Sequence, residues 1–280
     1  MKFKVKANLK YQIKSESTII LSVQALETEQ KIVSEELLIS PKTDYKELLS
    51  SAEANRLISL ALKPTENLLI SYSATVNNAF IIKEIKEFKE VNIAELPGDV
   101  LTYLNPSRYC QSDKLYRLAN NMFGYKKDDF EKVQALTHWI YLNVRYLSGS
   151  TDSQTSAYDT VTEQSGVCRD FAHLGIALCR ALTIPARYFT GYAYQLQPQD
   201  FHACFEAYIG GQWLLFDATR LIPLNGMVKI AVGRDAADAA VANIFGDVAF
   251  VSSQVSCELL DHDFKPFHQH HENRWAISYL

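Results

Sequence analysis

The sequence predicts an α+β protein: an antiparallel β-sandwich in residues 1–97, a mixed helical and stranded unit in residues 98–260, and a C-terminal tail in residues 261–280. Three observations predict this arrangement. Apolar residues alternate before Pro97, they recur at helical spacing after it, and the composition changes at that point. The length of 280 residues exceeds the usual size of a single domain and leaves room for two packed units.

The strands of the first unit are predicted from period-two alternation. Phe3 and Val5 alternate with lysines in a run that continues to about Ile13. Segments that contain proline or asparagine lie between the later runs and supply turns. The further predicted strands are Thr18–Ala25, Lys31–Ile39, Asn55–Leu62 and Asn67–Thr75.

Helical spacing predicts two helices early in the second unit, and a polar loop, Ser148–Thr160, follows them. Leu115, Leu118 and Met122 share one face of the first helix. Asp128 and Asp129 can cap the second helix. The apolar face of this second helix carries Phe130, Val133, Thr137, Ile140 and Val144.

The charge balance and the start of the chain exclude several classes of protein. There are 28 Lys and Arg against 32 Asp and Glu, a net charge of −4, so the basic surface that binds nucleic acid is missing. The start of the chain has no apolar signal segment, and no stretch has the roughly 18 apolar residues of a membrane span. We therefore expect a cytoplasmic protein with neither nucleic-acid nor membrane partners.

The residues that carry chemistry are confined to the second unit. Residues 1–97 contain no Gly, Cys, His or Trp, so the 5 Cys and 7 His of the chain all follow. An odd number of cysteines without a CxxC pair argues against a disulfide framework, and reduced thiols are expected. Any enzymatic site should lie in residues 98–260.

Cys168 is the first candidate for that site because it begins a predicted helix. Phe171, Leu174, Leu178 and Leu182 continue an apolar helical pattern that ends before Pro185. Unpaired N–H groups and the helix dipole at an N-terminus stabilise a thiolate, the nucleophilic form of cysteine. An intracellular cysteine is more often a small core residue, so the neighbouring segments have to decide.

A predicted β-hairpin supplies partners for Cys168. Two alternating runs, 202–209 and 212–219, flank the turn Gly210–Gly211. With this turn His202 lies opposite Thr219, and Asp217 becomes its diagonal neighbour at about 7–8 Å on the same face. The other face, with Phe205 and Phe216, should meet the core. If the hairpin packs against the start of the helix, Cys168, His202 and Asp217 can form a nucleophile, base and orienting carboxylate.

These segments resemble the bacterial transglutaminase-like family, some of whose members are described as cysteine proteases. The resemblance rests on GVCRDFAHLGIALCRALTIPARYFTGY, HACFEAYIGGQWLLFDAT and IAVGRDAAD. It implies a papain-like, transglutaminase-like core behind a β-rich N-terminal domain, with Cys168, His202 and Asp217 as the catalytic triad. Two positions depart from the family pattern: Cys204 stands where Trp is usual, and residues 238–241 lack the prolines often found there.

The tetrahedral intermediate of acyl transfer needs hydrogen-bond donors. The backbone N–H of Cys168 is one, and Gln164 is a candidate for a side-chain donor, although a surface glutamine is the commoner role. Trp139 could line the site, but a tryptophan on an amphipathic helix usually belongs to the core.

Other polar residues near the triad have two readings each. Arg169 and Asp170 could support the site or form an ordinary solvated helix start. Glu206 and Tyr208 share the face of His202 and could contact substrate, or could lie on a solvated hairpin face. His173, one turn into the helix, is expected to be structural.

No metal or cofactor is predicted. The tail residues His262, His268, His270 and His271, near Asp263 and Glu272, could bind a metal, but a polar tail seldom fixes the geometry that a metal site needs. A thiol mechanism needs no cofactor.

The predicted activity is attack of Cys168 on an amide or peptide carbonyl, with His202 as base and Asp217 as its orienting partner. The acyl-enzyme could pass to water, as in a protease or amidase, or to an amine, as in a transglutaminase. Hydrolysis is favoured because water is always present, whereas transfer needs a site that excludes it. A non-catalytic member that binds peptides in the same groove and a purely structural scaffold are the other hypotheses.

Overall fold

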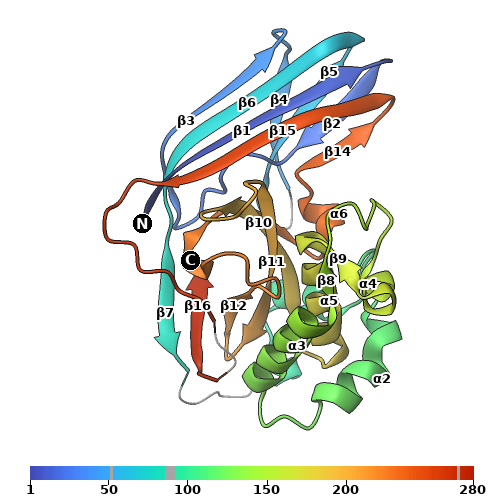
Figure 1. Ribbon diagram of the computed structural model, residues 1–280, viewed down its shortest axis with the longest axis vertical. Helices are drawn as coiled ribbons and strands as arrows, with labels where there is room; N and C mark the ends of the chain where they lie inside the picture. The colour runs from blue at the N-terminus through green and yellow to red at the C-terminus, as the bar shows by residue number, and fades with distance from the viewer. Residues whose placement is uncertain (51–52, 86–91, 270–271) are drawn as a thin grey trace.

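The protein is described from a computed structural model that covers residues 1–50, 53–85, 92–269 and 272–280. A β-sandwich lies above a core of sheet and helices, as Figure 1 shows. The predicted α+β class, with an N-terminal β-rich part, is confirmed.

The sandwich consists of two four-stranded antiparallel sheets, with strand orders β15-β1-β6-β3 and β14-β2-β5-β4. Alternation places Phe3, Val5 and Leu9 of β1 inside the sandwich and leaves Lys4 and Lys6 exposed. Most predicted strands are found within a few residues, but β4 and the later β7 were not predicted. The strands contributed by the first part of the chain are β1 (Lys2–Ile13), β2 (Ser17–Leu21), β3 (Lys31–Ser40), β4 (Tyr45–Leu49), β5 (Arg56–Leu62) and β6 (Thr65–Asn77).

The last part of the second unit returns to the sandwich. Strand β14 (Ala242–Phe245) pairs with β2, and β15 (Val248–Leu259) pairs with β1 along nearly its whole length. From the sequence, these residues are expected in the unit 98–260. The local pattern of a strand does not indicate that its partner lies at the other end of the chain. The sandwich therefore contains strands from both ends of the chain.

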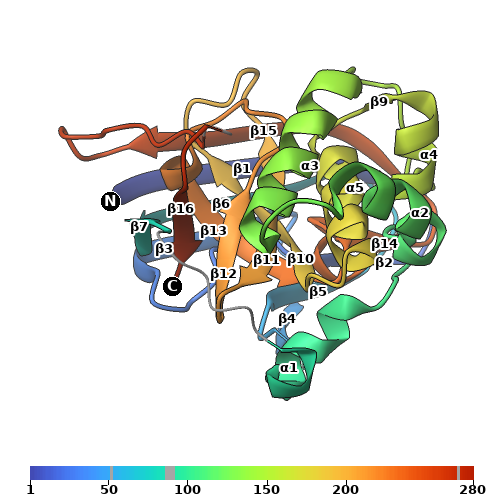
Figure 2. The same ribbon diagram turned by 90° about the horizontal axis from the view of Figure 1, so that it is seen from below.

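The core is a four-stranded antiparallel sheet with helices on one side, as seen from below in Figure 2. Its strand order is β12-β11-β10-β13. The strands are β10 (Ala186–Ala193), β11 (Phe201–Ile209), β12 (Gln212–Phe216) and β13 (Met227–Gly233), and a short parallel pair joins β8 (Arg145–Tyr146) to β9 (Ser165–Gly166). The helices are α1 (Gly98–Leu101), α2 (Ser112–Phe123), α3 (Asp129–Asn143), α4 (Ala157–Glu163), α5 (Cys168–Ala181) and α6 (Ala236–Ala239).

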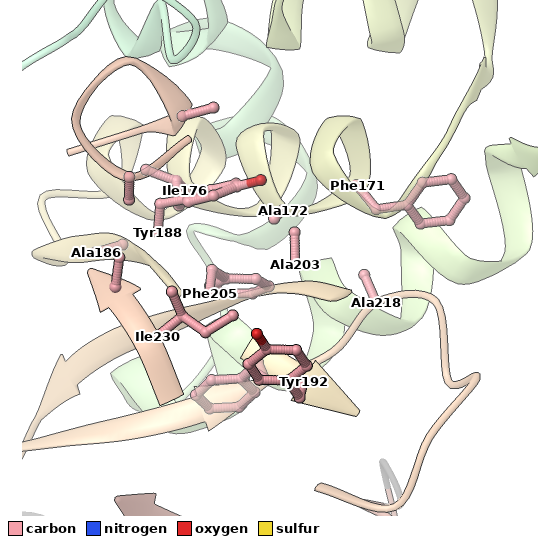
Figure 3. Packing of buried hydrophobic residues seen from close by; sticks show 14 of the residues in the cluster. Phe171, Ala172, Ile176, Ala186, Tyr188, Tyr192, Ala203, Phe205, Ala218 and Ile230 are labelled. Atoms are coloured by element: carbon pink, nitrogen blue, oxygen red, sulfur yellow. The ribbon is translucent and has the colours of Figure 1, made fainter. Parts of the chain in front are cut away.

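Helix α5 lies directly on the core sheet, and Figure 3 shows Phe171, Ala172 and Ile176 above Ala203 and Phe205. Gly175 makes this close approach possible, since a Cβ atom there would lie 2.5 Å from the Phe205 ring. The predicted helices α2, α3 and α5 are found, with Asp128 capping α3. The predicted loop Ser148–Thr160 is shorter than expected, because α4 begins at Ala157. Hydrogen bonds between Ser156 and Asp159 cap the start of this helix.

The hairpin β11–β12 has the predicted register. Ile209 pairs with Gln212 and Phe205 with Phe216. Gly210 and Gly211 both have positive φ, which this two-residue turn requires. The predicted core face is buried, so the turn residues alone gave the correct pairing.

The opposite hairpin face is also buried, so the interpretation of a solvated face is wrong. Cys204 and Leu215 join a second apolar cluster with Phe189, Ile277 and Tyr279. Ile277 and Tyr279 belong to β16 (Trp275–Tyr279), which pairs with β7 (Phe80–Glu84) and covers this face. The segment 261–280 is thus more than a polar tail, because it contributes a strand.

Buried hydrogen bonds fix the sandwich to the core. Gln30 bonds the backbone N–H and C=O of Lys229, and Asn55 does the same with Val232. The Tyr192 hydroxyl donates to the carbonyl of Val23. Such paired polar groups orient the two parts relative to each other. Within the part of the chain that the structure describes, no helix has the length and apolar character of a membrane span.

Candidate active site

Cys168 stands at the first turn of α5, where the backbone is held by a buried carboxylate. Asp170, fully buried, accepts hydrogen bonds from the N–H of Val167 at 2.9 Å and the hydroxyl of Thr151 at 2.7 Å. Arg169 bonds the other Asp170 oxygen at 2.9 Å and the carbonyl of Asp152 at 2.5 Å. These bonds tie the start of α5 to the preceding polar loop, so the thiol is presented from a fixed backbone.

His202 and Asp217 form a buried pair on the hairpin. The His202 Nε2 atom lies 3.1 Å from Asp217 Oδ2, and both side chains are almost fully excluded from solvent. Thr219 fixes the carboxylate by donating its backbone N–H at 2.8 Å and its hydroxyl at 2.7 Å to Asp217 Oδ1. The carboxylate therefore orients the imidazole, with Nε2 as the nitrogen bound to Asp217.

Cys168 and Cys204 also interact with the His202 ring. Nδ1 of His202 is buried and makes no hydrogen bond of ordinary geometry to another described residue. Burial alone would lower the pKa of His202, but the charge and hydrogen bond of Asp217, with contributions from Cys204 and Cys168, raise it well above its usual range. Burial likewise opposes the Asp217 charge, yet His202 and Thr219 hold the pKa of that carboxyl low. The Asp217 carboxylate thus makes the His202 imidazole a stronger base.

The other four cysteines lie in different surroundings. All four are buried, whereas Cys168 is partly exposed. Burial raises the pKa of Cys110 and of Cys204 to about 12, and it also raises the pKa values of Cys179 and Cys257. These four thiols are neutral core groups at physiological pH.

Cys168 and His202 open into a cavity of about 420 Å³. One wall is formed by α6 and the chain after it, and Arg169 and Tyr109 contribute to the rim. Buried hydrogen bonds hold this wall: the Tyr109 N–H donates to Asp235 at 2.8 Å, and the Ala236 N–H donates to His173 Nε2 at 3.1 Å. The wall is lined by Ala236, Ala237, Ala239, Ala240, Val241, Ala242 and Asn243.

His173 has the structural role expected from the sequence. Its ring is fully buried between Tyr109 and Tyr188, each with its centroid 5.0 Å away. Burial lowers the pKa of His173 well below its usual value. The neutral ring accepts a hydrogen bond rather than taking part in proton transfer.

Tyr146 is a site residue that the sequence analysis missed. It belongs to β8, which the parallel pairing with β9 places beside the start of α5. Burial, and then the charge of Cys168, raises the pKa of Tyr146 to about 12, and its hydroxyl interacts with both the backbone N–H and the thiol of Cys168. The β8–β9 pair is two residues long, and a two-residue strand has no periodicity to detect.

Two candidates lie away from this cavity. Gln164 is exposed in the left-handed conformation at the end of α4, and its carbonyl accepts the Arg145 N–H. Trp139 packs edge-to-face on Phe123 in a pocket between α2 and α3 that does not contain Cys168. Neither residue lines the cavity that contains Cys168 and His202.

The remaining candidates divide into two groups. Arg169 lines the cavity, and Asp170 is buried behind it, so a solvated helix start is wrong for Asp170. Glu206 is fully buried away from the cavity, with Oε2 at 2.6 Å from Arg187 Nε and Oε1 at 3.6 Å from Lys229 Nζ. Tyr208 packs on Trp213 at the turn end of the hairpin.

One group of three potential metal ligands comes together in the described residues: His202, Cys204 and Asp217, with ligand atoms within 4.8 Å of one another. This group overlaps the His202–Asp217 hydrogen bond, and Cys204 is a protonated thiol. In the tail, His262 and His268 are exposed, while His270 and His271 lie outside the described residues.

Two family profiles match separate parts of the chain. Residues 1–99 match the bacterial transglutaminase N-terminal domain, and residues 116–218 match the transglutaminase-like superfamily. The second match includes Cys168, His202 and Asp217. The first match ends at residue 99, shortly after Pro97.

Individual proteins extend this similarity. A solved structure described as a candidate cysteine protease from Cytophaga hutchinsonii is 52% identical, covers 100% of this chain and 98% of its own, and has a TM-score of 0.98. An uncharacterised Mycobacterium leprae protein is 27% identical over 146 residues, 49% of this chain and 52% of that protein. A Mycobacterium tuberculosis protein is 36% identical over 103 residues, 35% of this chain and 32% of that protein. The chain thus spans about half the length of the first curated relative and a third of the other. It belongs to the transglutaminase-like superfamily and carries the N-terminal domain of bacterial transglutaminases.

Proposed function

We propose that this protein is a cysteine hydrolase that cleaves amide or peptide bonds through an acyl-enzyme on Cys168, with His202 and Asp217 as the other members of a catalytic triad. The observation that carries the proposal is that two elements bring Cys168 and His202 to one cavity, while Asp217 is hydrogen-bonded to His202. Helix α5 presents the thiol, β11 presents the imidazole, and the chain after β12 presents the carboxylate bonded to it. A cytoplasmic location remains part of the prediction from sequence.

Acylation uses the imidazole as a proton carrier. The Cys168 proton passes to His202 Nδ1, because Nε2 is bonded to Asp217. The thiolate sulfur then bonds to the carbonyl carbon, and the carbonyl π electrons move to oxygen. When the tetrahedral intermediate collapses, the C–N bond breaks and His202 donates its proton to the leaving nitrogen. The products are an amine and a thioester on Cys168.

Deacylation reverses the roles. His202 takes a proton from water, whose oxygen attacks the thioester carbon. The C–S bond breaks, a carboxylic acid leaves, and the proton on His202 restores the Cys168–His202 pair. An amine in place of water would give a new amide, which is the transglutaminase outcome. Hydrolysis is favoured because transfer needs a bound amine and exclusion of water.

The negative oxygen of the intermediate needs donors, and Tyr146 supplies one in this proposal. Its hydroxyl lies beside the backbone N–H of Cys168, which is the donor expected at a nucleophile's own peptide group. A small rotation of the partly exposed tyrosine would let both groups donate to the substrate oxygen.

Tyr146→Phe is expected to lower the kcat for peptide amides by about 10²–10³, the usual effect of losing one oxyanion donor. Alkylation of Cys168 forms no oxyanion, so its rate should stay close to that of the unchanged protein. Tyr158→Phe, at a 45% exposed position on α4, is the matched control. Equal losses in turnover and alkylation would instead assign Tyr146 a structural role.

Selective alkylation tests the proposal itself. At pH about 6, iodoacetamide should modify Cys168 well before the four buried cysteines, because its thiolate is stabilised by the imidazolium of His202. Peptide mapping by mass spectrometry after a short exposure identifies the modified residue. Uniform modification of the five cysteines would contradict the enzyme assignment.

Isotope incorporation distinguishes hydrolysis from transfer. Unfolded casein is incubated in heavy-oxygen water with an excess of a small primary amine. Hydrolysis places the heavy oxygen in new carboxyl groups, whereas transfer attaches the amine. Predominant amine attachment would replace the hydrolase by a transglutaminase.

A further inference from the structure

Strand β14 is both a sheet edge and part of the active-site wall. It is the end strand in the order β14-β2-β5-β4, so one of its edges has no partner strand among the described residues. Ala242 and Asn243 of β14 line the same cavity as Cys168 and His202. Figure 1 shows β14 immediately above α6, at the junction of sandwich and core.

The register shows which peptide groups point toward the open edge. Val241 accepts the Ser22 N–H, so this pair lies at a hydrogen-bonded position of the ladder between β14 and β2. In an antiparallel ladder these positions alternate. Ala242 and Ile244 therefore occupy non-bonded positions, and their N–H and C=O groups point away from β2. The open edge presents a donor and an acceptor beginning at the cavity.

The side chains around this edge leave room for another strand. The wall is built largely of alanines, and Arg169 is its one permanently charged residue among those described. Ile244 and Phe245 are 40% and 59% exposed, although exposed apolar edges are usually blocked by charge or covered. A segment lying here would meet backbone groups and small apolar side chains.

We propose that the acyl substrate is an extended, unfolded polypeptide segment that binds as an added strand on β14, paired with the peptide groups of Ala242 and Ile244. The inference rests on the proposed function, because the edge is continuous with the cavity of Cys168. Recognition then comes mainly from main-chain hydrogen bonds, with the alanine wall accepting small or apolar side chains near the scissile bond. Folded proteins, whose backbones are already paired, are poor substrates.

Ala242→Pro tests this pairing. Proline removes the N–H that points to the open edge and leaves the β2 hydrogen bonds intact, since proline is tolerated at such edge positions. The ratio of unfolded-casein cleavage to 4-nitrophenyl acetate hydrolysis should fall about tenfold, the effect of one lost hydrogen bond. The acetyl ester has no chain to pair with the strand. Ile244→Pro removes the second donor and should lower the same ratio.

Glu47→Pro is the matched control. It lies on β4, the opposite edge of the same sheet, and the bond from the Ser50 N–H to Asn55 gives its N–H the same outward direction. Its ratio should equal that of the unchanged protein. Urea unfolding midpoints of all three variants check that the sheet is preserved.

A second readout separates this inference from the proposed function. Unfolded casein should bind the Cys168→Ala variant more tightly than the Cys168→Ala, Ala242→Pro double variant. A smaller ratio together with weaker binding supports strand addition. An unchanged ratio in both β14 proline variants, or equal binding, overturns it while leaving the hydrolase intact. Casein binding that depends on Ala242, without hydrolysis of any probe, would instead overturn the hydrolase and keep the docking edge.

Discussion

His202→Ala is expected to lower peptide hydrolysis by a factor on the order of 10⁴ or more and to remove the rapid alkylation of Cys168 at pH about 6. In the proposed mechanism, the imidazole is the base that takes the thiol proton and the acid that protonates the leaving nitrogen. It is also the cation that stabilises the thiolate. Loss of both peptide hydrolysis and rapid alkylation of Cys168 is expected when the residue removed is a base in contact with the nucleophile. His262→Ala, at an exposed position in the C-terminal segment, is the control.

Asp217→Asn examines the orienting partner in the same experiment. The side chain keeps its shape and loses the charge that raises the pKa of His202, so kcat should fall by about 10⁴. The sign of the pH effect follows. A raised pKa keeps His202 protonated to higher pH, and the imidazolium is needed to protonate the leaving nitrogen. In the variant the rate of amide hydrolysis should therefore decline at lower pH on the alkaline side. A full-rate Asp217→Asn variant with an unchanged pH profile would remove Asp217 from the triad.

Glu206→Gln is expected to destabilise the fold by about 3–5 kcal/mol, because it leaves buried cations without their anion. Glu206 is fully buried between Arg187 and Lys229, and Arg187 also contacts Glu53 of the sandwich at 3.2 Å. Urea unfolding monitored by circular dichroism measures the change. Glu35→Gln, which breaks the more exposed pair with Arg56, should cost no more than about 1 kcal/mol.

The stability lost in Glu206→Gln should depend on pH in a definite direction. Burial opposes the Glu206 charge, but Arg187 and Lys229 hold the pKa of that carboxyl below its ordinary value of 4.5. A lowered pKa gives stability that is present above pH 4.5 and is lost as the pH falls through the folded-state value. The difference in unfolding free energy between the unchanged protein and Glu206→Gln should therefore be largest near neutral pH and become smaller in acid. A gap independent of pH would mean that packing, rather than charge, explains the loss.

The proximity of His202 to Asp217 could be predicted because the hairpin geometry is mostly local. The apolar spacing after Cys168 marks a helix, and the Gly210–Gly211 turn fixes the register that puts His202 near Asp217. One assumption was needed: that the hairpin packs against the helix start. Gly175, whose missing side chain admits Phe205, is where the sequence permits that contact.

The features that escaped prediction depend on distant partners. The buried ion pairs of Glu206 could not be predicted, because Arg187 and Lys229 lie on other strands and β16, which covers this face of the hairpin, comes much later in the chain. Tyr146 reaches Cys168 through a pairing of only two residues on each side. Apolar and polar residues alternate in 242–259 as they do in the strands of any antiparallel sheet. This pattern does not indicate that the partner strands are β1 and β2.

The pairing of β1 with β15 also bears on how the chain can fold as it is synthesised. β1 leaves the ribosome well before its partner β15, so a hydrogen-bonding edge of β1 stays open while the residues between them are made. Lys4, Lys6 and Lys10 project from that strand into solvent. Charged side chains on an unpaired strand discourage pairing with other nascent chains. These lysines are therefore placed to prevent aggregation before β15 has been synthesised.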